Sequence, residues 1–400
     1  MMTKTMDGWF FLRPGFSSFQ IRPETQPGLL FGTREQKKRD YLIGEIEGAC
    51  YGRAGYKAVV FGDYGRGKTH LSMNLKFKSA HEGLGVVPIY LKCSAYTAKE
   101  PFSTLFGQFL RELNLNDVRR VTIEYFKLVA DGKARPIREI VHLEDVALAI
   151  ENGLQLPNDN VVRDTMRWLG GEKVNMTLVA AQLKDRLTDS REFGAVMRGL
   201  THMYREVDGK VLLYFLDEAE RLENITHIDT FAAWTAAFRE LTEVEGLGLI
   251  MFIGALTRNA LPTILLSEEI IRRVGVANYV EFQNPGRDDI RDFLIELLET
   301  LVRKGPVPEI HRPAMSAEAL GEDVPEGLAE ATGGDVERLR YYPFEPDAFE
   351  DFVEQIAAGD LTGKPSEALI RLTKAATTAM RKDRKTIDAK IVDDIGQEGF

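Results

Sequence analysis

One eight-residue segment constrains the fold more than any other, because Gly62-Asp63-Tyr64-Gly65-Arg66-Gly67-Lys68-Thr69 follows the pattern GxxxxGK[ST]. Glycines let backbone N–H groups turn towards a phosphate, and the helix that follows directs its positive end there. In this pattern Lys68 reaches the β- and γ-phosphate oxygens and Thr69 offers its hydroxyl to Mg²⁺. The alternative is a chance glycine-rich turn, but the segment follows an apolar run and precedes a helical pattern. We expect residues 62–70, which include His70, to bind a nucleoside triphosphate.

Apolar runs that alternate with helical patterns predict a parallel α/β core. The expected strands are Lys57–Gly62, Val86–Leu91, Val211–Leu216 and Leu247–Leu256. Residues from about 115 to 205 lack a strand pattern and are expected to form a helical insertion. After residue 285 only helical patterns remain. The predicted fold class is therefore a three-layer parallel sheet with a helical insertion and a C-terminal α-helical domain.

The same patterns predict the domain boundaries. An N-terminal arm covers residues 1–30, a nucleotide-binding core residues 31–285, and a helical domain residues 286–400. A length of 400 residues fits one large domain with a smaller one.

Two acids follow the apolar run Val211–Leu216, and ligands of α/β sheets bind at the carboxyl ends of the strands. Asp217 is expected to hold Mg²⁺ through its water shell, and Glu218 to orient and deprotonate the attacking water. The alternative is that Asp217 caps the next helix. A third polar group, Thr257 or else Asn259, is expected to fix the water, although a threonine at a strand end is often only a turn residue.

Composition limits the cellular location and the kinds of partner that we expect for this protein. Lysine and arginine number 51 and aspartate and glutamate 61, which gives a net charge of −10 and disfavours a globally basic nucleic-acid binder. The two cysteines form no disulfide framework, and no apolar run reaches the ~18 residues of a membrane span. We expect a cytoplasmic protein without a membrane partner.

Together, GDYGRGKTHL and LLYFLDEAERL resemble an AAA+ P-loop ATPase of the origin-recognition and helicase-loader group. The segment Phe31–Glu35 is similar to the entry segment of that group, and Arg272-Arg273 before Tyr279–Phe282 to the segment with the arginine finger. Segments 342–349 and 363–369 resemble its lid helices. Two of the nucleotide segments and Trp168–Glu172 are similar to ATP-binding proteins of BREX-type phage-defence loci.

The resemblance implies the AAA+ core, ATP and Mg²⁺ as cofactors, and a homo-oligomeric ring or filament in which Arg273, or else Arg272, reaches a neighbour's γ-phosphate. A surface pair at a helix end is the alternative. Ser366 stands where the lid usually has an arginine, so Lys364 or Arg371 is left as its substitute. We expect no winged helix after the lid, since the resemblance leaves about 20 residues beyond it.

Duplex DNA and an effector protein are the candidate partners. A basic run spans residues 381–385, and basic residues of the insertion flank Tyr125 and Phe126. A solvated face or an ordinary amphipathic helix pair explains the same residues. We expect a Mg²⁺-dependent ATPase that oligomerises and remodels or loads a partner on DNA, plausibly in phage defence. The alternative is an ATP-gated scaffold or transposition-type regulator with slow hydrolysis.

Overall fold

The computed structural model describes residues 5–93, 101–174, 183, 185–225, 228–255, 257–283, 285–321, 323–358 and 364–397. The chain forms two compact units, each assembled from separate stretches. Unit 1 consists of residues 1–41, 64–74 and 283–400, and unit 2 of residues 42–63 and 75–282. This division places the N-terminal residues in the same unit as the C-terminal helices.

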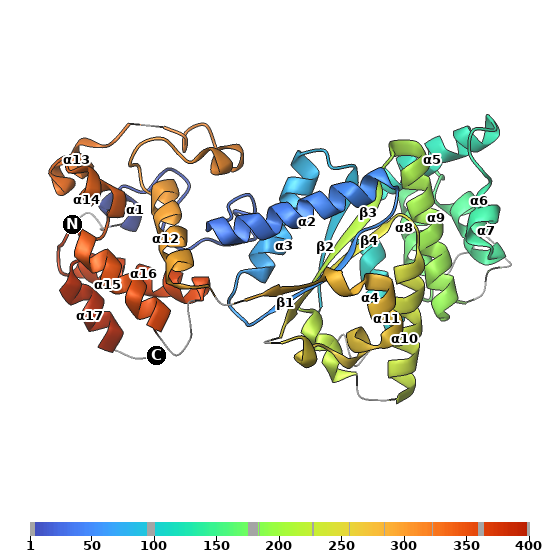
Figure 1. The fold of residues 1–400 in the computed structure, drawn as a ribbon. Helices are drawn as coiled ribbons and strands as arrows, with labels where there is room; N and C mark the ends of the chain where they lie inside the picture. The colour runs from blue at the N-terminus through green and yellow to red at the C-terminus, as the bar shows by residue number, and fades with distance from the viewer. Residues whose placement is uncertain are drawn as a thin grey trace. The chain divides into compact units, whose positions relative to one another are not determined.

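Unit 2 is built on a five-stranded parallel sheet with the order β2-β3-β4-β1-β5 (Figure 1). Its strands are β1 (Lys57–Gly62), β2 (Val86–Lys92), β3 (Val211–Asp217), β4 (Leu247–Gly254) and β5 (Tyr279–Phe282). Gly62 pairs with Gly254, and Lys92 pairs with Asp217. Because every pairing is parallel, the carboxyl ends of β1, β3 and β4 meet at one edge of the sheet.

The central strands are apolar and buried along their length. All seven residues of β3 are buried, as is typical of a parallel strand covered on both faces. β2 is an edge strand, which explains why Pro88 is tolerated in it. The four predicted strands are present, with Leu256 outside the described residues, whereas β5 was not predicted.

Helices complete the layers of unit 2. They are α4 (Phe102–Arg111), α5 (Leu115–Ala130), α6 (Ile137–Val141), α7 (Glu144–Gly153), α8 (Asp159–Leu169), α9 (Ser190–Asp208), α10 (Ile228–Glu243) and α11 (Glu268–Val274), while α2 (Thr33–Tyr51) and α3 (Lys68–His81) have residues in both units. The predicted insertion is helical, and it shares one core with the sheet, since α9 packs against β3 and α10. The predicted fold class is confirmed.

The segment Trp168–Glu172 is a packing element. Trp168 and Leu169 are fully buried, and a Cβ at Gly170 would lie 3.0 Å from the Cα of Gly107 in α4. Gly171 has a φ of +85°, a conformation that favours glycine. These glycines allow the end of α8 to approach α4 closely, so the segment needs no ligand to explain it.

Unit 1 is helical. It contains α1 (Met6–Trp9), α12 (Arg287–Leu301), α13 (Glu326–Thr332), α14 (Val336–Tyr341), α15 (Pro346–Ala358), α16 (Pro365–Arg381) and α17 (Ala389–Gln397). Phe10 and Phe19 are fully buried in the same core as Leu298 and Phe349. Arg13 is 1% exposed and donates a 2.6 Å hydrogen bond to the carbonyl of Gly321. The N-terminal residues are thus part of the core of unit 1.

Two glycines that precede β1 should respond to alanine with opposite signs. A Cβ at Gly55 would lie 1.8 Å from the carbonyl oxygen of Leu247, so Gly55→Ala is expected to lower the free energy of unfolding by about 1–3 kcal/mol. Gly48 lies in α2 with nothing within 4 Å of its Cβ position, so Gly48→Ala should raise it by about 0.5–1 kcal/mol. Urea unfolding measures both. Equal effects of the two substitutions would contradict this packing.

Candidate nucleotide-binding site

The glycines of the phosphate loop are required for two different reasons. Gly65 and Gly67 have φ values of +77° and +81°, which side chains rarely adopt. Gly62 ends β1, where a Cβ would lie 2.7 Å from the Cβ and the carbonyl oxygen of Phe282 in β5. The left-handed glycines shape the loop, and Gly62 permits the close pairing of β1 with β5.

The residues after the loop begin α3, as the motif requires. Lys68 is its first residue, 8% exposed, with its ammonium 5.9 Å from the ring centre of Tyr64. The first turn of α3 contains no acid that would compete with a phosphate for its N–H groups. The hydroxyl of Thr69 makes no hydrogen bond with any residue that the structure describes, so it can serve a metal ion.

His70 faces the N-terminal segment. Burial lowers the pKa of its ring, against the opposing effect of hydrogen bonds with the backbone of Leu29 and Gln26. Asn74, one turn further along α3, donates a 2.7 Å hydrogen bond to the carbonyl of Pro27. These contacts fasten residues 26–29 to α3 within unit 1. His70 thus lies against the N-terminal residues, and its expected contact with the nucleotide stays a prediction.

Asp217 is held rigidly at the end of β3. It is 3% exposed. Its Oδ1 accepts a 2.9 Å hydrogen bond from the backbone N–H of Glu218, and its Oδ2 accepts a 2.8 Å hydrogen bond from the hydroxyl of Tyr90. The hydrogen bond from Glu218 joins adjacent residues and is not a cap of the helical turn Ala219–Asn224, whose N-cap is Glu218 without a side-chain cap. A carboxylate held in this way can still serve a metal ion.

Glu218 is held by two cations. Its Oε1 lies 2.8 Å from Nζ of Lys92, and its Oε2 accepts hydrogen bonds of 2.8 Å and 2.6 Å from Nε and Nη2 of Arg221. Its backbone has a φ of +54°, in the left-handed region that is uncommon for glutamate. Partial burial would raise the pKa of Glu218, but the hydrogen bonds from Lys92 and Arg221 outweigh it and hold the pKa below its ordinary value.

This lowered pKa has a measurable consequence if Glu218 is the base. Because the pKa is lowered, Glu218 stays deprotonated as the pH falls through the ordinary carboxyl range. Protonation of Glu218 should therefore reduce kcat only at a pH below that range. Lys92→Met removes one of the lowering charges, and we expect the acid limb of the kcat profile to move to higher pH. Lys133→Met, which removes a surface pair with Asp131, is the control. An unmoved limb would contradict the assignment of Glu218.

The side chain of Thr257 is exposed three residues after β4 ends. The guanidinium of the adjacent Arg258 lies 4.6 Å from the ring centre of Tyr279. Asn259, the second candidate for positioning the water, is also exposed. At the same edge Glu220 accepts a 2.8 Å hydrogen bond from the N–H of Gly254. The structure thus leaves Thr257 accessible beyond the strand edge, and its role stays a prediction.

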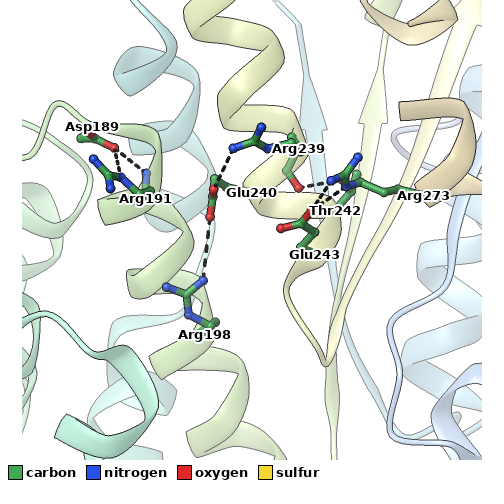
Figure 2. Close-up of polar contacts among 8 residues, drawn as sticks. All are labelled: Asp189, Arg191, Arg198, Arg239, Glu240, Thr242, Glu243 and Arg273. Atoms are coloured by element: carbon green, nitrogen blue, oxygen red, sulfur yellow. Dashed lines mark hydrogen bonds and ion pairs between the residues drawn. The ribbon is translucent and has the colours of Figure 1, made fainter. Parts of the chain in front are cut away.

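The two candidate arginines differ in their surroundings. Arg273 is 16% exposed; it contacts Glu243, with its Nε 2.8 Å from Oε1, and donates a 2.9 Å hydrogen bond to the carbonyl of Glu269. Figure 2 shows its side chain turned towards Glu243 of α10. Arg272 is exposed and has no ion pair with any described residue. Arg272 is thus the more accessible of the two side chains, and which of them reaches another subunit stays a prediction.

The start of α16 contacts the phosphate loop within unit 1. The N–H of Ser366 donates a 3.4 Å hydrogen bond to the carbonyl of Gly65, and a Cβ at Gly65 would meet Ser366 Oγ at 2.5 Å and Lys364 Cδ at 3.4 Å. Arg371 pairs with Glu367 at 2.6 Å. Lys364 is therefore the better substitute for a lid arginine. Gly363 lies outside the described residues.

A small hollow of about 20 Å³ lies in unit 1, at a place that the sequence did not predict as a pocket. It is lined by Phe31, Gly32, Arg34, Glu35, Pro285, Asp289, Ile290, Phe293, Pro365 and Ala368. Burial raises the pKa of Glu35, against the effect of nearby cations that include Arg66 of the phosphate loop. The signal in the sequence was the entry segment Phe31–Glu35. The hollow has apolar walls and a few polar groups, as is common for small-molecule sites.

The basic segments are largely neutralised. In residues 381–385, Lys382 pairs with Asp394 at 2.7 Å, Arg384 pairs with Asp388, and Lys385 lies 3.8 Å from the ring centre of Trp9. In the insertion, Tyr125 is fully buried and Phe126 packs against the core. Ion pairs engage most of its basic residues, namely Arg119, Arg120, Lys127, Lys133 and Arg138. Residues 381–385 thus favour a solvated face, and the insertion favours an ordinary amphipathic helix pair.

No protein-family model matches the chain, and no curated protein matches it. Among solved structures, the chain is similar to the ORC2 protein of Aeropyrum pernix, with a TM-score of 0.48, 14% identity, and coverage of 92% of this chain and 68% of that chain. It is also similar to Cdc6p of Pyrobaculum aerophilum, with a TM-score of 0.47, 12% identity, and coverage of 95% and 68%.

The chain also matches an ORC chain of Drosophila, solved in complex with DNA, with a TM-score of 0.45, 11% identity, and coverage of 92% of this chain and 61% of that chain. It spans less than two thirds of that chain. None of the helices that the structure describes is long and apolar enough to cross a membrane. Among the same residues, no three histidine, cysteine or acidic side chains gather as a metal site.

Proposed function

We propose that the chain is a Mg²⁺-dependent ATPase of the AAA+ type that assembles with copies of itself and remodels or loads a partner on duplex DNA. One observation carries the proposal. The phosphate loop, with Gly65 and Gly67 in left-handed conformations, joins β1 to α3, and Asp217-Glu218 ends β3 at the edge of the sheet where β1 also ends. Only β4 separates the two strands in the sheet.

Each residue of the site has a role in this proposal. Lys68 and the N–H groups at the start of α3 bind the β- and γ-phosphates. Thr69 and Asp217 hold Mg²⁺, whose oxygen preference fits a hydroxyl and a carboxylate, with waters and phosphates completing its shell. The ion supplies charge neutralisation to the phosphates. Glu218 accepts the proton of the attacking water, and Thr257 positions that water.

The hollow beside Phe31 is the proposed site of the adenine base. Its aromatic and apolar walls suit the faces of a flat base, which would have to part them because the hollow itself measures only about 20 Å³. Pro365 of its wall adjoins Lys364 and Ser366, which contact the phosphate loop. Base and phosphates would then be bound by the same unit. Lys364 supplies the charge that a lid arginine gives in the resembling group.

Arg272 is the proposed contribution of one subunit to the site of its neighbour, where its charge would stabilise the γ-phosphate during transfer. The ring or filament this implies is part of the proposal, together with an effector protein as a further partner. A role in phage defence and a cytoplasmic location rest on the sequence resemblance and on the free thiols of Cys50 and Cys93.

Calorimetry with the intact chain tests the core of the proposal. ATP titrated in the presence of Mg²⁺ should give saturable heat, and excess GTP should compete poorly. Phosphate release should then accompany incubation with ATP. Absence of heat from any nucleoside triphosphate would overturn the proposal.

A second candidate, an ATP-gated scaffold with slow hydrolysis, is favoured by the two ion pairs that hold Glu218 and by Ser366 at the arginine position. A base held by two cations is poorly placed to take up a proton. Sizing the protein with and without ATP, beside a turnover assay, separates the candidates. Assembly with ATP but negligible turnover supports the scaffold, and assembly accompanied by sustained turnover supports the ATPase.

A further inference from the structure

Tyr90 lies on β2, and its side chain contacts Asp217 of the neighbouring strand β3, which is not the residue directly opposite it. In the register of β2 and β3, Tyr90 pairs with Phe215, and Asp217 lies two residues further along β3 on the same face. The tyrosine side chain is long enough to cover this diagonal, and its hydroxyl donates a 2.8 Å hydrogen bond to Oδ2 of Asp217.

The carboxylate of Asp217 is consequently fixed through both oxygens. Oδ1 accepts from the N–H of Glu218, and Oδ2 accepts from Tyr90, so the plane of the carboxylate cannot rotate without breaking a hydrogen bond. Each oxygen retains a second lone pair. A fixed acceptor with free lone pairs is what a hydrated Mg²⁺ ion needs, and partners behind a ligand orient it and tune its affinity for the metal.

We propose that Tyr90 is a positioning residue for Mg²⁺, which acts by fixing the carboxylate of Asp217 at the end of β3. This inference rests on the proposed function. It adds a residue that the phosphate-loop and acid motifs do not contain, because Tyr90 precedes Asp217 by 127 residues in the chain. If the hydroxyl had a purely structural role, its loss would leave metal binding unchanged. Tyr90 is only partly buried, so the protein should fold without this hydroxyl and the two roles can be told apart.

Tyr90→Phe tests the proposal, because it removes the hydroxyl and keeps the ring. The intact chain is loaded with a non-hydrolysable ATP analogue, and Mn²⁺, as a paramagnetic substitute for Mg²⁺, is titrated by electron paramagnetic resonance. We expect the variant to bind Mn²⁺ roughly tenfold more weakly. Its affinity for the analogue in EDTA and its thermal midpoint should match those of the wild type.

Two further variants make the result specific. Tyr125→Phe removes a tyrosine hydroxyl in the insertion, which donates to the carbonyl of Arg135, and should leave Mn²⁺ binding unchanged. In an Asp217→Asn background, Tyr90→Phe should have little further effect, because the hydroxyl acts through that carboxylate. Equal Mn²⁺ affinity of Tyr90→Phe and wild type, or an equal loss of analogue binding in EDTA, overturns the inference. A wild-type chain that binds no analogue overturns the proposed function itself.

Discussion

Lys68→Ala is expected to abolish ATP turnover and to weaken ATP binding by at least about 100-fold. Lys68 is the first residue of α3 and is 8% exposed, so its ammonium is largely withdrawn from water and its attraction for phosphate oxygens is screened less than that of a surface lysine. Alanine has high helix propensity, so α3 should persist in the variant. Calorimetry with ATP and Mg²⁺ gives the affinity, and phosphate release gives the rate.

The matched control is Lys78→Ala, which removes a lysine from the last turn of the same helix. Lys78 pairs with Glu82 at 2.7 Å on the surface, and the loss of such a pair changes stability by less than about 1 kcal/mol. ATP binding of this variant should equal that of the wild type. If both lysine variants lose binding equally, the effect comes from the helix as a whole, and the assignment of Lys68 fails.

The sequence predicts the phosphate loop and the four long strands because both depend on local order. A glycine pattern between an apolar run and a helical pattern has few structural solutions, and strands such as β3, with all seven residues buried, leave a continuous apolar signal. The strand β5 leaves none. It has four residues, of which only Phe282 is buried, and its pairing with β1 depends on Gly62, more than 200 residues earlier.

Side-chain partners are harder to predict than strands, because they come from distant parts of the chain. His70 follows the phosphate loop directly, and its hydrogen bonds with the backbone of Gln26 and Leu29 could not be predicted from its place in the chain. Arg272 and Arg273 are neighbours in sequence, and their different surroundings appear only in the fold, where Arg273 contacts Glu243 of α10 and the carbonyl of Glu269. Tyr90 carries no motif at all, because its partner is defined by the register of β2 and β3.

Glu218→Gln is expected to lower kcat for ATP hydrolysis by about 10²–10⁴-fold while ATP binding is retained. Glutamine has the shape of glutamate and can still accept a hydrogen bond from Arg221, but it cannot take up the proton of water. The substitution also removes the charged partner of Lys92. A thermal midpoint equal to that of the wild type is therefore needed to show that the lower kcat comes from loss of the base and not from unfolding around residue 218. Single-turnover hydrolysis measures the rate, and calorimetry confirms binding.

The control for this variant is Glu223→Gln in the helical segment Ala219–Asn224 that follows Glu218. The Glu223 side chain accepts a 3.1 Å hydrogen bond from the N–H of Thr263, which glutamine can also accept. Its turnover should equal that of the wild type. The size of the Glu218 effect also decides between the two candidate functions. If the pairs with Lys92 and Arg221 persist when ATP is bound, the wild type already hydrolyses slowly and glutamine removes little, as the scaffold predicts. A drop of two orders of magnitude or more instead means that the carboxylate leaves these cations to act as the base.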